Sequence, residues 1–161
     1  MPDEFFVNID LKDIQRVAEK LNLLPAFKAG VLAGAGHVKK VIAVYPPQTD
    51  GNMPGPYPKR WYVRGYGPHW ALKGGGINRE KTSEQLGQRW TYRPTNDGLS
   101  AVVGNNASYA EEVQGAQKQK AVHARHGWLT DETVAEQEAG AVRELITESI
   151  RAEINRKGLQ P

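Results

Sequence analysis

The stretch that decides the fold is RWTYRPTNDGLSAVVGNNASYAEEVQG, residues 89–115. Large and β-branched side chains alternate with polar ones over residues 89–93, which is the period of a half-buried strand. Pro94 ends this strand, and Asn96-Asp97-Gly98 supplies residue types that tolerate positive φ in a tight turn. The apolar residues after the turn return as a partner strand. The pattern therefore predicts a β-hairpin over about residues 89–104.

Short helical turns are expected on both sides of the hairpin. Thr82-Ser83-Glu84-Gln85 offers a hydroxyl N-cap and a glutamine that can reach back to the capping residue. After the hairpin, residues 107–113 have the composition of a short helix, and Gly115 stands at its C-cap position.

The N-terminal part predicts a strand and two helices. Residues 5–9 are apolar enough for a strand, and Asp10 is placed to cap a helix that ends at Asn22. A second helix is expected from Pro25 to Tyr45, stopped by Pro46-Pro47. It contains Gly30, Gly34 and Gly36, each of which costs about 1 kcal/mol relative to alanine inside a helix. Close packing against another element is the expected compensation.

A long C-terminal helix begins after Thr130, which can act as its N-cap. Asp131 and Glu132 complement the positive helix start, and Gly158 can close the far end. Its apolar residues form one stripe, which we expect to pack on the sheet made by the hairpin: Val134, Ala141, Val142, Leu145, Ile146, Ile150 and Ile154.

Together these elements predict an α+β fold in one domain over residues 1–161. A small antiparallel sheet is packed by the N-terminal helices and the long C-terminal helix. Residues 46–79 form a loop excursion or arm that is rich in proline, glycine, aromatic and basic residues. Its rings either cover the core of their own domain or contact a neighbouring subunit, because Trp, Tyr and Arg are enriched at interfaces.

Composition narrows the class of protein. The 161 residues are 39% hydrophobic and 24% charged, with a net charge of +3 that gives weak support for nucleic-acid binding. The absence of cysteine excludes disulfides and thiolate metal sites. No apolar run approaches the roughly 20 residues of a membrane span. We expect a soluble, unprocessed chain that contacts no membrane.

The order of motifs from Ser83 to Trp128 resembles tail-completion or minor tail proteins of long-tailed bacteriophages and prophages. The resemblance lies in the Gly-containing hairpin, in VGNNASYA (residues 103–110), in Val113-Gln114-Gly115 and in His126-Gly127-Trp128. It covers roughly the C-terminal half. It implies a structural virion protein, in or near the neck between head and tail, that works as a ring, with six-fold closure, and it brings no catalytic residues.

Residues suited to chemistry occur without a diagnostic arrangement. His123 and His126 stand three apart but have no third metal ligand at a standard spacing. Adjacent carboxylates such as Glu111-Glu112 point in different directions on a helix. No serine has a nucleophile-elbow context, and the glycines at 74–76 lack the Lys-Ser/Thr of a phosphate loop. We expect no enzyme activity, no metal and no cofactor.

Three functions remain open. The first is the virion protein, joined in a ring with itself and with head-closure, tail-terminator or tail-tube proteins, close to packaged DNA, and made in the host cytoplasm. The second is a nucleic-acid-binding module that uses the basic-aromatic loop 57–79 through Lys59, Arg60, Arg64, Lys73 and Arg79. The third is a hydrolase built on Glu112, His123 and His126. The candidate intersubunit or partner contacts are Tyr57, Arg60, Trp61, Tyr62, Arg64, Tyr66, Trp70, His126 and Trp128.

Overall fold

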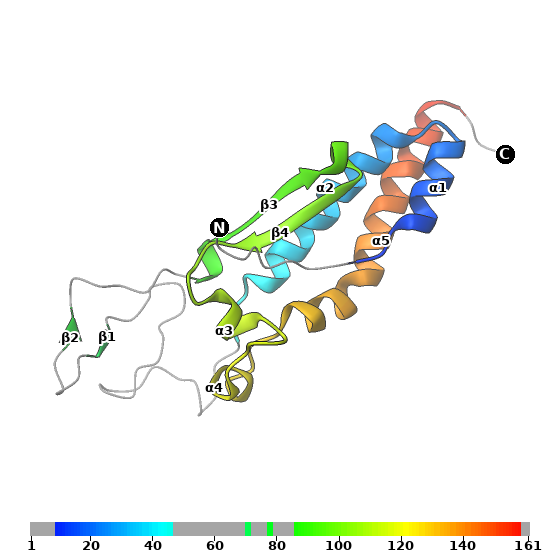
Figure 1. Cartoon of the computed structure of the whole chain (residues 1–161). Coiled ribbons are helices and arrows are strands. Elements are labelled where there is room, and N and C mark those ends of the chain that lie inside the picture. Colours follow the sequence, from blue (N-terminus) through cyan, green and yellow to red (C-terminus); the bar gives the residue numbers. More distant parts are fainter. Residues whose placement is uncertain (1–8, 47–69, 72–76, 79–85, 159–161) are drawn as a thin grey trace.

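A computed structural model describes residues 9–46, 70–71, 77–78 and 86–158. Its central element is the helix α2 (Leu24–Ile42). The long helix α5 (Asp131–Arg156) runs along one side of α2, and a hairpin of β3 (Trp90–Thr95) and β4 (Ser100–Asn105) lies on another side (Figure 1). The short helix α1 (Lys12–Lys20) packs across α2 and α5. The α+β class predicted from the sequence is confirmed.

The N-terminal helices begin and end near the predicted places. The amide of Lys12 donates to the Asp10 carboxylate over 3.1 Å at the start of α1. The chain then reverses at Asn22, whose φ is 55°, and Pro25 lies in the first turn of α2. Helix α2 stops at Ile42, before the predicted end at Tyr45, because Tyr45 packs against Trp128 instead.

The glycines of α2 allow a close approach of α5. A Cβ on Gly30 would lie 2.6 Å from the Cα of Ile146, and one on Gly34 would lie 2.8 Å from a methyl of Val142. Close packing therefore compensates the cost of Gly30 and Gly34, as predicted, but the prediction fails for Gly36, where a Cβ would meet the Tyr92 ring at an ordinary 3.6 Å. A 2.6 Å contact between His37 Nε2 and the Glu138 carboxylate extends this interface between α2 and α5. Phe27, Val134 and Ile146 are fully buried in the core that α2, α5 and the hairpin share.

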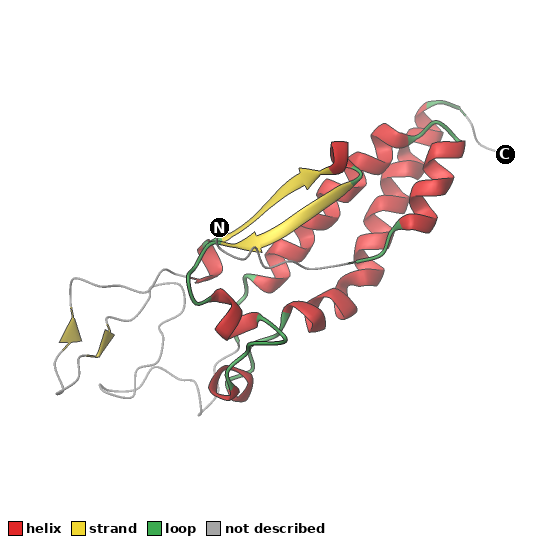
Figure 2. Cartoon of the chain, in the orientation of Figure 1, coloured by secondary structure: helices red, strands yellow, loops and turns green. Residues whose placement is uncertain are grey.

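The predicted packing of the C-terminal stripe on the sheet is wrong. Helix α5 packs chiefly against α2, and the hairpin packs on α2 from another direction (Figure 2). A stripe of apolar residues shows which face of a helix is buried and leaves open what buries it. Here the small residues of α2 determine which element covers the stripe, because they bring the backbones of α2 and α5 together.

The hairpin pairs from Trp90 opposite Asn105 to Thr95 opposite Ser100, close to the predicted range. Asn96, Asp97 and Gly98 have φ values of 48°, 53° and 85°, as the turn prediction requires. Pro94 does not end β3, contrary to expectation: it is an exposed residue of the strand, opposite Ala101. Proline is tolerated there because an edge strand need not donate on its outer side.

The remaining elements gather at the end of α2. They are the short helices α3 (Ala110–Gln114) and α4 (Ala121–Arg125) and the 3-10 turn η1 (Leu86–Gln88). Gly115 follows α3, and Thr130 caps α5 by accepting from the amide of Thr133 over 3.2 Å, both as predicted. Gly158 follows α5 with a φ of 66°.

Part of the predicted organisation lies outside the described residues: the strand at 5–8, the capped turn at 82–85 and most of the excursion 46–79. Within the excursion, β1 (Trp70–Ala71) and β2 (Ile77–Asn78) pair antiparallel. Among the helices that the structure describes, none has the length and apolarity that crossing a membrane requires.

Gly30→Ala tests the α2–α5 seam. The new Cβ must displace the backbone of α5 at Ile146, so we expect a loss of about 1–3 kcal/mol in the free energy of unfolding, despite the better helix propensity of alanine. Gly140→Ala on α5 is the matched control, since its Cβ meets nothing within 4 Å, and it should stabilise by up to about 1 kcal/mol. Urea unfolding measures both. Equal effects of the two substitutions would contradict the close approach.

Candidate functional site

Both ends of the segment 47–85 are anchored at one place. The amide of Gly87 donates to the hydroxyl of Tyr45 over 3.4 Å. A Cβ on Gly87 would lie 2.7 Å from the carbonyl oxygen of Ala43 and 2.7 Å from the Tyr45 ring, so only glycine fits. Burial raises the pKa of the Tyr45 phenol above its ordinary 10.0, which keeps the hydroxyl neutral. Pro46 and Leu86, the described residues that flank this segment, are the sequence neighbours of the two residues in this contact.

Trp128 packs next to the contact between Tyr45 and Gly87. Its ring packs edge-on against Tyr45, with centroids 4.9 Å apart, and only 7% of the residue is exposed. Leu86, Ala107, Ala110 and Val113 complete a second hydrophobic cluster around it. Trp128 thereby holds the chain that follows the turn at Gly127, whose φ is 83°. As a candidate partner contact, however, Trp128 offers little surface, because its own chain covers it.

Gln114 ties three parts of the chain together from the interior, where it is 1% exposed. Its amide nitrogen donates to the carbonyl of Ile42 at the end of α2 over 2.9 Å, and to that of Leu129 over 3.4 Å. Its amide oxygen accepts from the Trp90 indole N–H over 3.3 Å. One side chain thus joins α2, the hairpin and the approach to α5.

Two further amide side chains hold the chain around Trp128. The Asn105 nitrogen donates to the Leu86 carbonyl over 2.9 Å, and its oxygen accepts from the amide of Ala107 over 2.8 Å. The Gln119 nitrogen donates to the carbonyls of Val113, over 2.8 Å, and Trp128, over 2.9 Å. We name this network and the second hydrophobic cluster, with Tyr45, Gly87 and Gln114, the anchor cluster. Hydrophobic periodicity carries no signal for a buried amide, so the sequence does not predict this role for Gln114 or Gln119.

His123 lies on α4, and His126 follows it. His123 is half-buried, and burial lowers the pKa of its imidazole below the ordinary 6.5, with further lowering by His126 and Lys120. Glu112 forms an ion pair with Lys120. His126 is the C-cap residue of α4. Within the described ranges, no three His, Asp or Glu side chains gather in a way that could hold a metal ion.

Most of the predicted contact residues are not placed. Tyr57, Arg60, Trp61, Tyr62, Arg64 and Tyr66 lie outside the described residues. The backbone of Trp70 is described in β1, where it pairs with Asn78. The basic residues of the nucleic-acid reading, Lys59, Arg60, Arg64, Lys73 and Arg79, also lie outside the described ranges.

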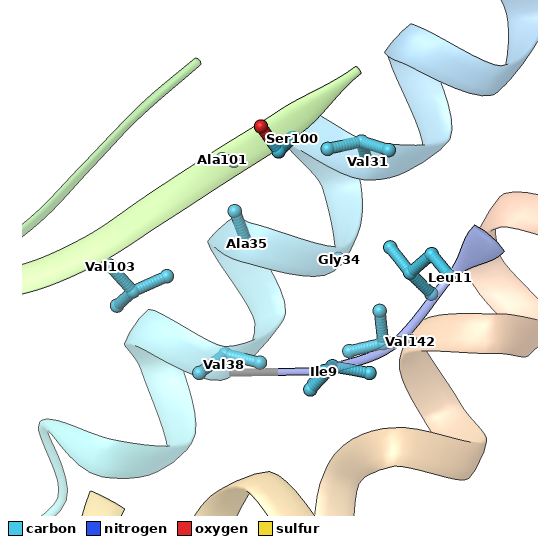
Figure 3. Close-up of a pocket in the computed structure, with 10 residues that line it drawn as sticks. All are labelled: Ile9, Leu11, Val31, Gly34, Ala35, Val38, Ser100, Ala101, Val103 and Val142. Carbon is cyan, nitrogen blue, oxygen red and sulfur yellow. The ribbon is translucent and has the colours of Figure 1, made fainter. Parts of the chain in front are cut away.

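A shallow apolar groove follows β4 on the surface of α2 (Figure 3). Its volume is about 140 Å³, and its floor is formed by α2 residues such as Ala35 and Val38. Ala101 and Val103 of β4 line one side, and Ile9 with Val142 of α5 line the other. Since Ala35, Val38, Val103 and Val142 are also core residues, the groove is an open seam of the hydrophobic core.

Gln114→Leu should destabilise the protein although leucine has a similar volume. The substitution leaves the Ile42 carbonyl and the Trp90 N–H without their partner, and each buried unpaired group costs roughly 1–3 kcal/mol. Denaturant unfolding gives the change in free energy. Gln137→Leu on the exposed side of α5 is the control and should stay within about 0.5 kcal/mol of the wild type. Equal stability of both variants would remove Gln114 as a structural hub.

Acid should destabilise the protein partly through His123. The folded state lowers the pKa of His123, so the unfolded chain binds more protons once the pH falls below about 6.5, and the free energy of unfolding decreases there. The contribution is fully present above that pH and is lost progressively as the pH falls towards the folded-state pKa. His123→Gln should flatten this part of the stability profile, measured by urea unfolding between pH 5 and 8. Parallel profiles for the variant and the wild type would contradict this.

Known proteins supply no template for this arrangement. Comparison with protein-family models, with curated proteins and with solved structures found no match. The resemblance to phage tail-completion proteins therefore rests on the residues that carry it, and the function has to be argued from their geometry.

Proposed function

We propose that this protein is a structural virion protein of a tailed bacteriophage, a tail-completion or head-to-tail neck component that acts by assembling into a ring. The observation that carries the proposal is the anchor cluster. The motif residues that resemble the family, among them Val103, Asn105, Ala110 and Trp128, are used to build the body and to hold the base of the segment 47–85. These motif residues therefore have a structural role in the subunit.

The anchor cluster is consistent with a segment that binds a neighbouring subunit. A segment rich in Trp, Tyr and Arg begins and ends at one rigid point of a small body. Such side chains dominate the binding energy of protein interfaces, and in this proposal they bind a second molecule. In this proposal, neighbouring copies and the adjoining head-closure or tail proteins are the partners, and the protein has no enzymatic role.

Assembly should be visible directly. Purified full-length protein is expected to form rings, which electron microscopy and native mass measurement would detect. Replacing Trp61 and Trp70 by alanine should weaken ring formation at least tenfold and leave the unfolding transition of the subunit in place. Trp128→Ala is the contrasting variant, since truncating a buried tryptophan costs about 3–5 kcal/mol of stability.

Three results would count against the proposal. A wild-type protein that stays monomeric at all concentrations, and shows no density in a phage neck or tail, would exclude ring assembly. Unfolding of the subunit by Trp61→Ala and Trp70→Ala would instead show that the aromatic rings cover their own core. Binding to DNA that falls steeply with salt, without self-association, would favour the nucleic-acid-binding alternative.

A further inference from the structure

One edge of the hairpin lacks the residues that usually protect a free strand edge. Within the described residues, β4 pairs with β3 and with no other strand. Residues 100–105 contain no proline and no charged residue, two features that keep a free edge from pairing with other strands. The partner strand β3 has both, at Arg93 and Pro94. The composition of β4 therefore indicates that another part of the protein covers its edge.

The apolar groove of Figure 3 runs along this edge of β4. Its walls come from β4, α2, α5 and the chain just before α1, and none of the described lining residues belongs to β3. Ile9 and Leu11 are partly buried against the core, whereas Asp10 between them is exposed. This alternation is that of an extended strand. The chain that enters α1 is therefore extended beside the edge of β4 that β3 leaves free.

The extended chain and β4 run in opposite directions (Figure 3). Ile9 lies at the Val38 end of the groove, and Leu11 lies at the Gly34 end. β4 runs the other way and reaches the Val38 end at Val103. Residues 9–11 are thus antiparallel to β4.

The sequence before Ile9 is suited to continue this arrangement. Residues 5–7 are apolar, and a period of two places Val7 on the same face of a strand as Ile9. On the groove side of α2, the residue one turn beyond Val38 is Val41, which is only partly buried. Apolar side chains are thus available in the sequence where an apolar surface of α2 lacks full cover.

We propose that residues 5–8 form a third strand, antiparallel to β4, which covers the free edge of the hairpin and packs Val7 on Val41. The occupant is the same chain because Ile9 already lies beside this edge. Four extended residues span about 13 Å, enough to pass the last two residues of β4. The added strand supplies the third partner that a marginal two-stranded hairpin lacks. This inference concerns the fold of each subunit and goes beyond ring assembly.

A disulfide across the proposed pair tests the placement, and the chain has no cysteine of its own to compete. Because Ile9 and Val103 lie at the same end of the groove, an antiparallel third strand places Asn8 opposite Gly104. Asn8→Cys with Gly104→Cys should therefore form an intramolecular disulfide in oxidised glutathione. The φ of Gly104 is not positive, so a cysteine fits its backbone. Non-reducing electrophoresis and mass spectrometry of the digested chain identify the bond.

The matched control moves one cysteine to the next strand. Thr91 of β3 lies opposite Gly104, so in the proposed sheet it is about 10 Å from Asn8, beyond the reach of a disulfide. Asn8→Cys with Thr91→Cys should therefore cross-link roughly tenfold or more slowly than Asn8→Cys with Gly104→Cys. Asn8→Cys with Val102→Cys, on the same face of β4, detects a register that is shifted by two residues.

The alternation of the proposed strand gives a second test. Val7→Ser removes an apolar side chain from the contact with Val41, so the melting temperature should fall by about 3–8 °C. Asn8→Ser, on the outward face of the strand, should leave the melting temperature within about 1 °C of the wild type. Equal melting temperatures of the two variants would contradict a strand that buries one face.

The outcomes separate this inference from ring assembly. A preferred intramolecular bond from position 8 to position 104 or 102 supports the third strand, whether or not rings form. Equal cross-linking of Asn8→Cys to both strands, or to neither, overturns the inference and leaves ring assembly standing. A bond between the same positions of two different chains would show that a neighbouring copy supplies the strand, which overturns its placement within one chain.

Discussion

The close approach of α2 and α5 is the constraint on which the rest of the structure depends. Gly30 and Gly34 let the backbones meet, and α2 then becomes the centre on which the hairpin and α1 also pack. Because α5 takes one side of α2, the sheet must take another, and both strands of the hairpin keep their outward faces free of α5. The positions of α5 and the hairpin around α2 therefore depend on two residues that lack a side chain.

The second constraint is polar and lies at the end of α2. Helix ends leave carbonyl groups without partners, and here the Gln114 amide nitrogen donates to the Ile42 carbonyl. The oxygen of the same side-chain amide accepts from the Trp90 indole N–H and holds the ring in place. This explains how a two-stranded hairpin, which is marginal by itself, is held in a defined position. Trp90 is held in two ways, because its ring packs in the core beside α2 and its indole N–H donates to Gln114.

Local signals in the sequence predicted the elements that depend on local chemistry. Asn96-Asp97-Gly98 specified the hairpin turn, and Thr130 specified the start of α5, because φ preference and capping act within a few residues. Partners distant in sequence were less accessible. The stripe of α5 was assigned to the wrong partner, and Pro94 was wrongly placed after its strand, because both depend on tertiary neighbours. At the candidate site, Trp128 was singled out as a contact residue, but its own chain buries it, and Gln114 and the pairing of Tyr45 with Gly87 could not be inferred from spacing.

The contact between Tyr45 and Gly87 brings the two ends of the segment 47–85 together. With its two ends already side by side, the closure entropy of such an insertion changes by only about 0.6 kcal/mol for each doubling of length. A segment of different length can therefore join the same two flanking residues at little cost in closure entropy. The contact at the base of the segment fixes where it begins and ends and leaves its length open.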